Sequence, residues 1–198
     1  MPRTLVIATR NPRKLEEIAA ILGPLGVRTM ALDTFADVPP VPETGETFED
    51  NARTKALAYA RATGEWTLAD DSGLEVDVLD GRPGVRSSRW GGQDGNDRLN
   101  NETLMQALAA HPRQAWTARF RCVMALATPD RVLAVTEGAC EGRITDRPAG
   151  SNGFGYDPHF YLPDLGRTMA QIPPELKNRL SHRAQAISAM KQRLTQLL

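Results

Sequence analysis

The strongest constraint on the fold is a change of hydrophobic period close to the N-terminus. Leu5-Val6-Ile7-Ala8 is a short apolar run of the kind that forms a buried strand. Asn11 is a favourable helix N-cap, and Pro12 suits the first helical position because its missing N–H is harmless there. The apolar residues that follow share one face of a helix: Leu15, Ile18, Ile21, Leu22 and Leu25. A strand that leads directly into an amphipathic helix predicts an α/β fold.

The rest of the N-terminal half continues this mixture. Thr47 and Asp50 form a capping pattern, which predicts a helix that runs to about Gly64. Residues 67–69 are typical of a strand that ends in the segment 70–73. Alternating apolar residues at 74–78 predict a second, half-buried strand.

The C-terminal half is also mixed. A glycine-rich loop over residues 81–96 precedes a helix with Leu99, Leu104 and Leu108. Alternation over 118–126 predicts a strand, with residues 131–136 as its hairpin partner. Ser181 is expected to cap a last helix, whose inward face carries Ala184, Ile187, Met190, Leu194 and Leu197. We therefore predict a single α/β domain over residues 1–198, with two lobes around a central mixed β-sheet and an active-site cleft between them.

The overall composition excludes several classes of function. The 24 basic and 24 acidic residues cancel, which argues against a nucleic-acid partner. No apolar stretch approaches the roughly 20 residues of a membrane span, and the N-terminal run is too short for a signal peptide. Cys122 and Cys140 are too few for a disulfide framework, so we expect reduced thiols and a cytoplasmic protein. An anionic ligand must then be held locally by a few well-placed groups.

The first candidate site is the segment from Thr9 to Lys14, between the first strand and helix. A helix N-terminus offers unpaired N–H groups and partial positive charge, which suit phosphate, and Arg13 and Lys14 add cations. The alternative is an ordinary capped helix with solvated basic residues. A Walker A loop is absent, so the segment is not an ordinary P-loop.

Carboxylates characterise the second and third candidate sites. Asn51 and Lys55 lie four residues apart on one helical face, with Glu43 in the loop before that helix. Asp70 and Asp71 follow a predicted strand, where paired acids repel unless a cation lies between them. Side chains alternate along a strand, so only one of these two acids faces a given site, and the alternation does not say which. Salt-bridged surface charges and a solvated turn are the alternatives.

The fourth candidate site combines a glycine-rich loop with the start of the last helix. Phe154 and Tyr156 could stack a base, and Asp157 could accept its N–H. Further on come Lys177, His182 and Arg183, and the last two oppose the helix dipole, which suggests a nearby anion or ligand. The alternative is a turn followed by an ordinary amphipathic helix.

Taken together and in this order, the four segments resemble the inosine triphosphate pyrophosphatase family, the dITP/XTP pyrophosphatases. The match runs from Leu5 to about Ala186, and its most specific pieces are residues 69–74, 153–158 and 181–183. The resemblance implies a two-lobed mixed α/β fold and a homodimer. It also implies Mg²⁺-dependent hydrolysis of a purine nucleoside triphosphate to the monophosphate and pyrophosphate.

The resemblance also implies roles for individual residues. Asp71 would be the general base or a metal ligand, with Glu43 as a second ligand and Ser72 as a substrate contact. The triphosphate would be held by Thr9, Arg10, Asn11, Pro12, Arg13, Lys14 and Lys55. The base and sugar would be surrounded by Phe154, Gly155, Tyr156, Asp157, Lys177, His182 and Arg183.

Three departures from the family pattern concern the phosphate and metal sites. Arg10 stands where relatives often have glycine, and Asp50 replaces a usual glutamate. Only Glu43 precedes the Thr44-Gly45 pair, with Pro42 before it, where some relatives carry two acids. Two alternatives stay open: a related pyrophosphatase for pyrimidine or methylated nucleotides, and a nucleotide sensor without turnover.

Overall fold

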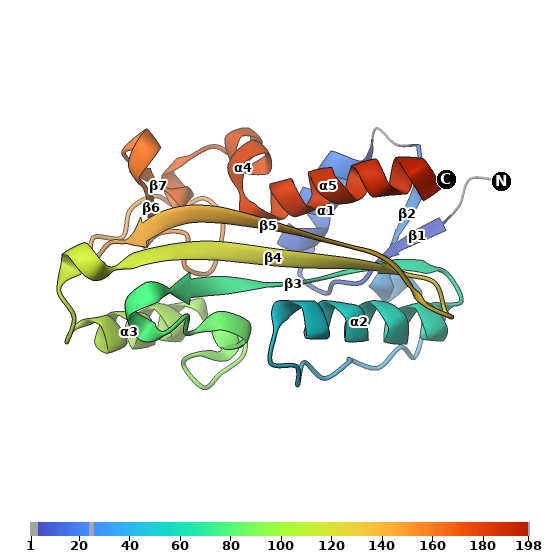
Figure 1. Ribbon diagram of the computed structural model, residues 1–198, viewed down its shortest axis with the longest axis horizontal. Coiled ribbons are helices and arrows are strands. Elements are labelled where there is room, and N and C mark those ends of the chain that lie inside the picture. Colours follow the sequence, from blue (N-terminus) through green and yellow to red (C-terminus); the bar gives the residue numbers. More distant parts are fainter. Residues whose placement is uncertain (1–3, 24–25, 198) are drawn as a thin grey trace. The chain divides into compact units, whose positions relative to one another are not determined.

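The computed structural model describes residues 4–23 and 26–197, apart from the side chain of Arg13. The predicted inward residue Leu25 lies outside this range. The chain forms two compact units (Figure 1). The first unit takes the chain up to Asp71, Cys122–Gly138 and the residues from Arg183 onward. The second unit takes Ser72–Arg121 and Ala139–His182.

The strands form one mixed sheet in the order β2-β1-β3-β4-β5-β6-β7. The strands are β1 (Thr4–Ile7), β2 (Arg28–Ala31), β3 (Trp66–Val76), β4 (Thr117–Ala127), β5 (Val132–Ile144), β6 (Phe160–Leu162) and β7 (Arg167–Thr168). β1 pairs in parallel with β2 and β3, whereas β5, β6 and β7 pair antiparallel. The predicted mixed α/β fold and the hairpin of β4 and β5 are therefore confirmed.

Five α-helices and several short 3₁₀ helices accompany the sheet in the described part of the chain. The α-helices are α1 (Pro12–Leu22), α2 (Phe48–Thr63), α3 (Asp97–Leu108), α4 (Pro174–Leu180) and α5 (His182–Leu197). The 3₁₀ helices are η2 (Leu32–Thr34), η3 (Asp77–Leu79), η4 (Gly84–Arg89), η5 (Arg113–Ala115), η6 (Pro163–Leu165) and η7 (Met169–Gln171). None of the helices in the described ranges is long and apolar enough to cross a membrane.

In the first unit, α1 and α5 cover one face of the strands and α2 covers the other (Figure 1). The core on the α1 and α5 side contains Leu5, Ile7, Leu68, Met124, Ile18, Leu22, Ile187 and Met190. The predicted inward face of the last helix is correct except at Leu197, which is 39% exposed. This residue lies at the end of α5, beyond the last position that packs on the strands.

The largest error in the sequence-based fold concerns the segment Asp70 to Gly73. The sequence predicts that one strand ends in this segment and that a second strand begins at residue 74, but β3 runs without interruption from Trp66 to Val76. Gly73 is needed for a close approach and not for a turn, because a Cβ there would lie 2.3 Å from Ser87 Oγ and 2.5 Å from the Gly84 carbonyl oxygen. The Ser87 hydroxyl also accepts the Leu74 N–H at 2.9 Å. The glycine thus lets the 3₁₀ helix η4 lie against an extended strand.

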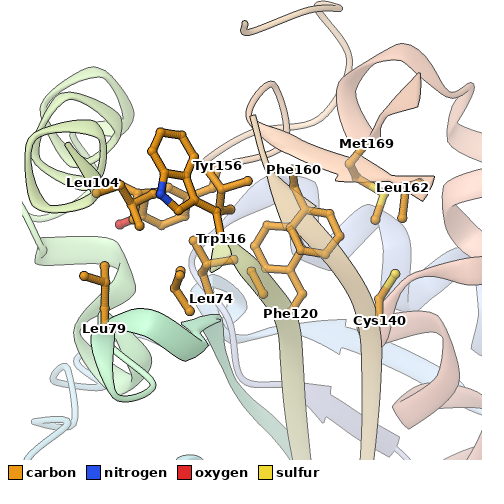
Figure 2. Packing of buried hydrophobic residues seen from close by; sticks show 14 of the residues in the cluster. Leu74, Leu79, Leu104, Trp116, Phe120, Cys140, Tyr156, Phe160, Leu162 and Met169 are labelled. Atoms are coloured by element: carbon orange, nitrogen blue, oxygen red, sulfur yellow. The ribbon is translucent and has the colours of Figure 1, made fainter. Parts of the chain in front are cut away.

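The aromatic rings of Trp116, Phe120, Tyr156 and Phe160 lie among aliphatic side chains in the core of the second unit (Figure 2). The rings of Phe120 and Phe160 lie 4.4 Å apart between their centres, at 40° to each other. Phe120 also stacks on His182 at 4.9 Å and 20°. These contacts fix the end of β4 against β6 and the first residue of α5.

Both cysteines are buried and lack a disulfide. Burial raises the pKa of Cys122 to about 12 and that of Cys140 to about 11. The thiols therefore stay protonated at neutral pH and act as small apolar core residues.

Candidate functional site

Strand alternation sends the two neighbouring acids of β3 to opposite faces of the first unit. Leu68 packs in the core beneath α1 and α5, so Asp70, two residues on, shares that side. Asp71 points the other way, toward residues of α2. Both are buried, with 3% and 5% of their surface exposed. The two acids therefore lie in separate environments, and Asp71 is the one that faces Asn51 and Lys55.

Asp70 is surrounded by cations. Lys14 Nζ donates to its Oδ2 at 2.9 Å, and Arg183 Nε lies 3.6 Å from the same oxygen. Arg183 also pairs with Glu17, Nη1 to Oε2 at 2.5 Å, and is only 2% exposed. Burial alone would raise the pKa of Asp70, but the charges of Lys14 and Arg183 outweigh it and hold that pKa well below its usual range.

Asp71 is held by the two residues predicted to share a face of α2. Asn51 Nδ2 donates to Asp71 Oδ2 at 2.9 Å, and Lys55 Nζ lies 3.8 Å from Oδ1. The same ammonium lies 2.5 Å from Glu43 Oε1. The loop of Glu43 is fixed in turn, because the Gly45 N–H donates to Asn51 Oδ1 at 2.8 Å. One helix therefore positions both carboxylates.

The electrostatics of Asp71 are the reverse of those of Asp70. Burial raises the pKa of Asp71 to about 6, opposed by Lys55 and reinforced by the Glu43 charge. Burial also disfavours the charged form of Lys55, but the carboxylates of Asp71, Asp70 and Glu43 outweigh it and raise the pKa of that lysine. The ammonium thus stays charged beside Asp71 and Glu43.

The donor set around Asp71 fits a divalent cation that is shared with a ligand. In the described part of the chain, no group of three or more His, Cys, Asp and Glu residues could hold a metal. Mg²⁺, however, is commonly held by only one or two carboxylates, with its other positions filled by water and phosphate oxygens. Glu43 and Asp71 supply two such carboxylates beside one ammonium, so an added cation would relieve their repulsion. They are the residues that could hold the metal.

The N-terminus of α1 is capped as predicted. Thr9 Oγ1 accepts the Asn11 N–H at 3.2 Å, and Asn11 Oδ1 accepts the Lys14 N–H at 3.4 Å. The first turn of α1, which begins at Pro12, contains no acidic residue. This arrangement leaves the positive end of the helix suited to an anion.

Of the two arginines in this segment, the structure describes the side chain of Arg10 but not that of Arg13. Arg10 is exposed, and its Nη2 donates to the Val38 carbonyl at 2.6 Å, while its Nε lies 4.0 Å from Asp33. It therefore contacts the loop after β2. The side chain of Arg13 lies outside the described part of the chain.

In the second unit, the predicted base-binding loop is built around a buried ion pair. Asp157 Oδ2 accepts from Lys177 Nζ at 2.8 Å and from the Phe154 N–H at 2.9 Å. Lys177 Nζ also lies 4.8 Å from the centre of the half-buried Phe154 ring. A side chain at Gly153 would collide with Asp157, since its Cβ would lie 2.0 Å from Oδ2. The loop thus carries an aromatic ring beside a fixed cation.

Two residues predicted to surround the base, Tyr156 and His182, have buried side chains. Tyr156 is 4% exposed, lies in the aromatic core and donates its hydroxyl to the Ser87 carbonyl at 2.8 Å. The ring is thus packed in the core, and its stacking on a base stays a prediction. His182 is buried and stacks on Phe120. Ser72 is half-buried in β3.

The structure divides the predicted site residues between the units. Thr9 to Lys14, Glu43, Lys55, Asp71 and Arg183 belong to the first unit, and the remainder belong to the second. Glu17, the partner of Arg183, was missed by the sequence analysis. Its position three residues after Lys14, on the same side of α1, was the available signal. The base-contact role of Arg183 stays a prediction, since its observed partners are carboxylates.

Sequence comparison finds the same pattern across nearly the whole chain. The model of the Ham1 family matches residues 5–193. A dITP/XTP pyrophosphatase of Geobacillus kaustophilus is 48% identical over 188 residues, which cover 95% of this chain and 92% of the relative. One of Geobacter sulfurreducens is also 48% identical, over 190 residues and 96% of both chains.

Solved structures agree with the sequence comparison. A HAM1 protein from Coxiella burnetii matches with a TM-score of 0.90 and 40% identity, over 98% of this chain and 99% of the other. The Ham1 protein of Staphylococcus aureus matches with a TM-score of 0.88 and 38% identity, over 99% of this chain and 100% of the other.

Proposed function

Because this chain belongs to the Ham1 family, we propose that it hydrolyses deaminated purine nucleoside triphosphates such as dITP, XTP and inosine triphosphate. The products are the nucleoside monophosphate and pyrophosphate. The names of the relatives give the reaction. The observation that supports this reaction in the present chain is the buried Asp71, which is held by Asn51 and flanked by Lys55 and Glu43. A rigid, partly neutralised carboxylate of this kind suits proton abstraction from water.

Asp71 acts in this proposal as the general base. With a pKa near 6 it is ionised at neutral pH and still basic enough to take a proton from an attacking water. Asn51 fixes its Oδ2, which leaves the direction of the carboxylate defined by α2. When bound by Glu43 and Asp71, Mg²⁺ would neutralise phosphate charge and acidify water.

The first unit would hold the triphosphate. Phosphoryl transfer depends mainly on positioning and charge neutralisation, so the protein needs cations and N–H donors more than a covalent nucleophile. Lys14, Lys55 and the N–H groups at the start of α1 are the groups available for this. Each lysine already lies beside a carboxylate, so both side chains are positioned before substrate arrives.

The second unit would hold the base through Phe154, Asp157 and Lys177, with Gly155 in the same loop and His182 at the start of α5. Hypoxanthine and xanthine carry an acceptor oxygen at position 6, where adenine carries a donor amine. A pocket that offers donors there leaves one unpaired with adenine, at a cost of about 1–3 kcal/mol. We expect inosine and xanthosine triphosphates to be hydrolysed far faster than ATP, with GTP also poor.

Pyrophosphate release from inosine triphosphate, with and without Mg²⁺, is the test of this function. ATP and CTP serve as matched substrates with the same triphosphate. Turnover of the inosine substrate that needs Mg²⁺ and exceeds turnover of ATP and CTP supports the proposal. Faster turnover of CTP would favour a pyrimidine enzyme, and tight binding without pyrophosphate release would favour a sensor.

The family resemblance also supports a homodimer and a cytoplasmic location as proposals. Light scattering on the purified protein would measure the assembly directly. A mass close to twice the 21.7 kDa of one chain is the expected result.

A further inference from the structure

One face of α3 holds both backbone hydrogen-bonding groups of Gly155. Asp97 Oδ2 accepts the Gly155 N–H at 2.8 Å, and Asn101 Nδ2 donates to the Gly155 carbonyl at 2.9 Å. The two side chains are four residues apart, so they lie one above the other on the helix. All three residues belong to the second unit. Neither Asp97 nor Asn101 was among the predicted site residues.

The orientation of the Asn101 amide is fixed by its partners. Its Nδ2 also donates to the Asp97 carbonyl at 2.8 Å. Both partners of the nitrogen are acceptors, so a flipped amide would place oxygen against two carbonyl oxygens. The helix that carries it is anchored by Leu104 and Leu108, which are fully buried. The two side chains are therefore a rigid support and not a mobile surface contact.

Gly155 needs such support because its conformation is an unusual one. Its φ is 63°, in the left-handed region, while a Cβ at this position would meet nothing within 4 Å. Glycine is thus required by backbone conformation and not by lack of space. Glycine reaches many other conformations at little cost, so the side chains of α3 select this one.

The backbone of the loop is hydrogen-bonded on both sides of the Phe154 side chain. The Phe154 N–H donates to Asp157, and the next residue, Gly155, is held by Asp97 and Asn101. Beyond that, Tyr156 is packed in the core and bonded to Ser87. The direction of the Phe154 ring therefore depends on the backbone of Gly155, which the α3 side chains hold.

We propose that Asp97 and Asn101 are positioning residues that set the Phe154 ring for stacking on the substrate base. The inference rests on the proposed function, because it assigns them to the base-binding part of that reaction. They act through the Gly155 backbone and touch no reacting atom. Their loss should weaken recognition of the base while leaving recognition of the phosphates intact.

Asn101→Asp is the sharpest test, because it keeps the size of the side chain and removes both hydrogen bonds. We expect KM for inosine triphosphate to rise about tenfold, as for partial loss of base stacking, with a smaller fall in kcat. Inhibition by inorganic tripolyphosphate, which has no base, should change less than about twofold. Asp97→Ala should behave in the same way, whereas Asp97→Asn, which retains an acceptor oxygen, should restore most of the affinity.

Combining Asn101→Asp with Phe154→Ala separates positioning from general damage. If Asp97 and Asn101 act through the Phe154 ring, Asn101→Asp should add little to the increase in KM that Phe154→Ala already causes. Full additivity, or an equal loss of affinity for tripolyphosphate in folded variants, would overturn the inference. Absence of turnover in the wild-type protein would instead overturn the proposed function. Binding of the monophosphate, measured by calorimetry, would still test the positioning role of Asp97 and Asn101.

Discussion

The surroundings of Asp70 and Asp71 differ although the residues are adjacent, chemically identical and almost equally buried. Asp70, with Glu17, faces the two cations Lys14 and Arg183, so charges on that side balance. Asp71, with Glu43, lies beside the ammonium of Lys55, and burial outweighs that charge in its effect on the pKa of Asp71. Burial sets the cost of a charge, but the number of nearby opposite charges decides whether a carboxylate becomes structural or chemically reactive.

The largest expected effect is on stability, from Asp70→Asn. The change leaves Lys14 and the buried Arg183 without one of their counter-charges, so we expect unfolding to become easier by about 3–5 kcal/mol. Urea denaturation at pH 7 measures this. Asp71→Asn is the matched control and should cost little or raise stability, because burial disfavours the charged form of Asp71 at pH 7. Equal losses in the two variants would mean that the two sides do not differ as described.

Turnover should show the opposite order. Asp71→Asn removes the proposed general base and should lower kcat for inosine triphosphate by at least about 10²-fold in a folded protein. Asp80→Asn is a suitable control, because Asp80 is exposed and its φ of 55° is one that asparagine tolerates. Near-normal turnover of the Asp71 variant would show that the general base has been wrongly assigned.

The pH dependence of stability should have opposite signs for the two acids, measured without divalent cations. Between pH 4 and 6 the folded state keeps a proton on Asp71 that the unfolded chain has released, because burial raises that pKa from 3.8 to about 6. The contribution of Asp71 to stability therefore falls as pH rises through this window, by on the order of 2–3 kcal/mol.

Asp70 has a lowered pKa, so the unfolded chain binds its proton more readily than the folded state. Its stabilising contribution is present above pH 4 and is lost as pH falls below that value. Subtracting the pH curve of each Asn variant from that of the wild type isolates each slope. Parallel slopes for the two acids would contradict the electrostatic comparison.

The smallest effects are expected from replacing the lysine that lies beside each acid, Lys14 at Asp70 and Lys55 at Asp71. Lys14→Ala and Lys55→Ala should each raise KM for the triphosphate by about tenfold, as expected for one lost charged contact. Binding of the monophosphate product should change less, because it lacks the β and γ phosphates. Lys191→Ala is the control, since Lys191 lies in α5 outside the proposed site. An equal change in both affinities would mean that these lysines do not contact the outer phosphates.

Local signals made parts of the fold predictable. The Thr47 side chain accepts the Asp50 N–H at 3.1 Å, and Gly64 ends α2 in the left-handed conformation, as the sequence indicated. The continuity of β3 was not predictable in this way, because Asp-Asp-Ser-Gly is typical of a turn. What keeps it extended are partners such as Lys14 and Asn51, which lie 56 and 20 residues away from the acids they contact.

The candidate site was also predictable only where local spacing brings its residues together. Asn51 and Lys55 share a helical face by simple spacing, and the structure brings both to Asp71. The pairing of Glu17 with Arg183 joins residues 166 positions apart. The spacing from Lys14 places Glu17 on one side of α1, but it does not identify Arg183 as its partner. The core position of the Tyr156 ring likewise depends on Ser87, 69 residues away. The short strands β6 and β7 were missed because two or three residues carry no measurable period.

The two buried thiols make this protein convenient for site-specific labelling. The thiolate is the form of cysteine that attacks thiol-labelling reagents, and the raised pKa values of Cys122 and Cys140 leave almost no thiolate at pH 7. A cysteine introduced at an exposed position such as Ser151 would therefore react selectively in the otherwise unaltered sequence. The fluorescence of a dye attached there would then report in solution whether the surroundings of this exposed loop change when nucleotide is added.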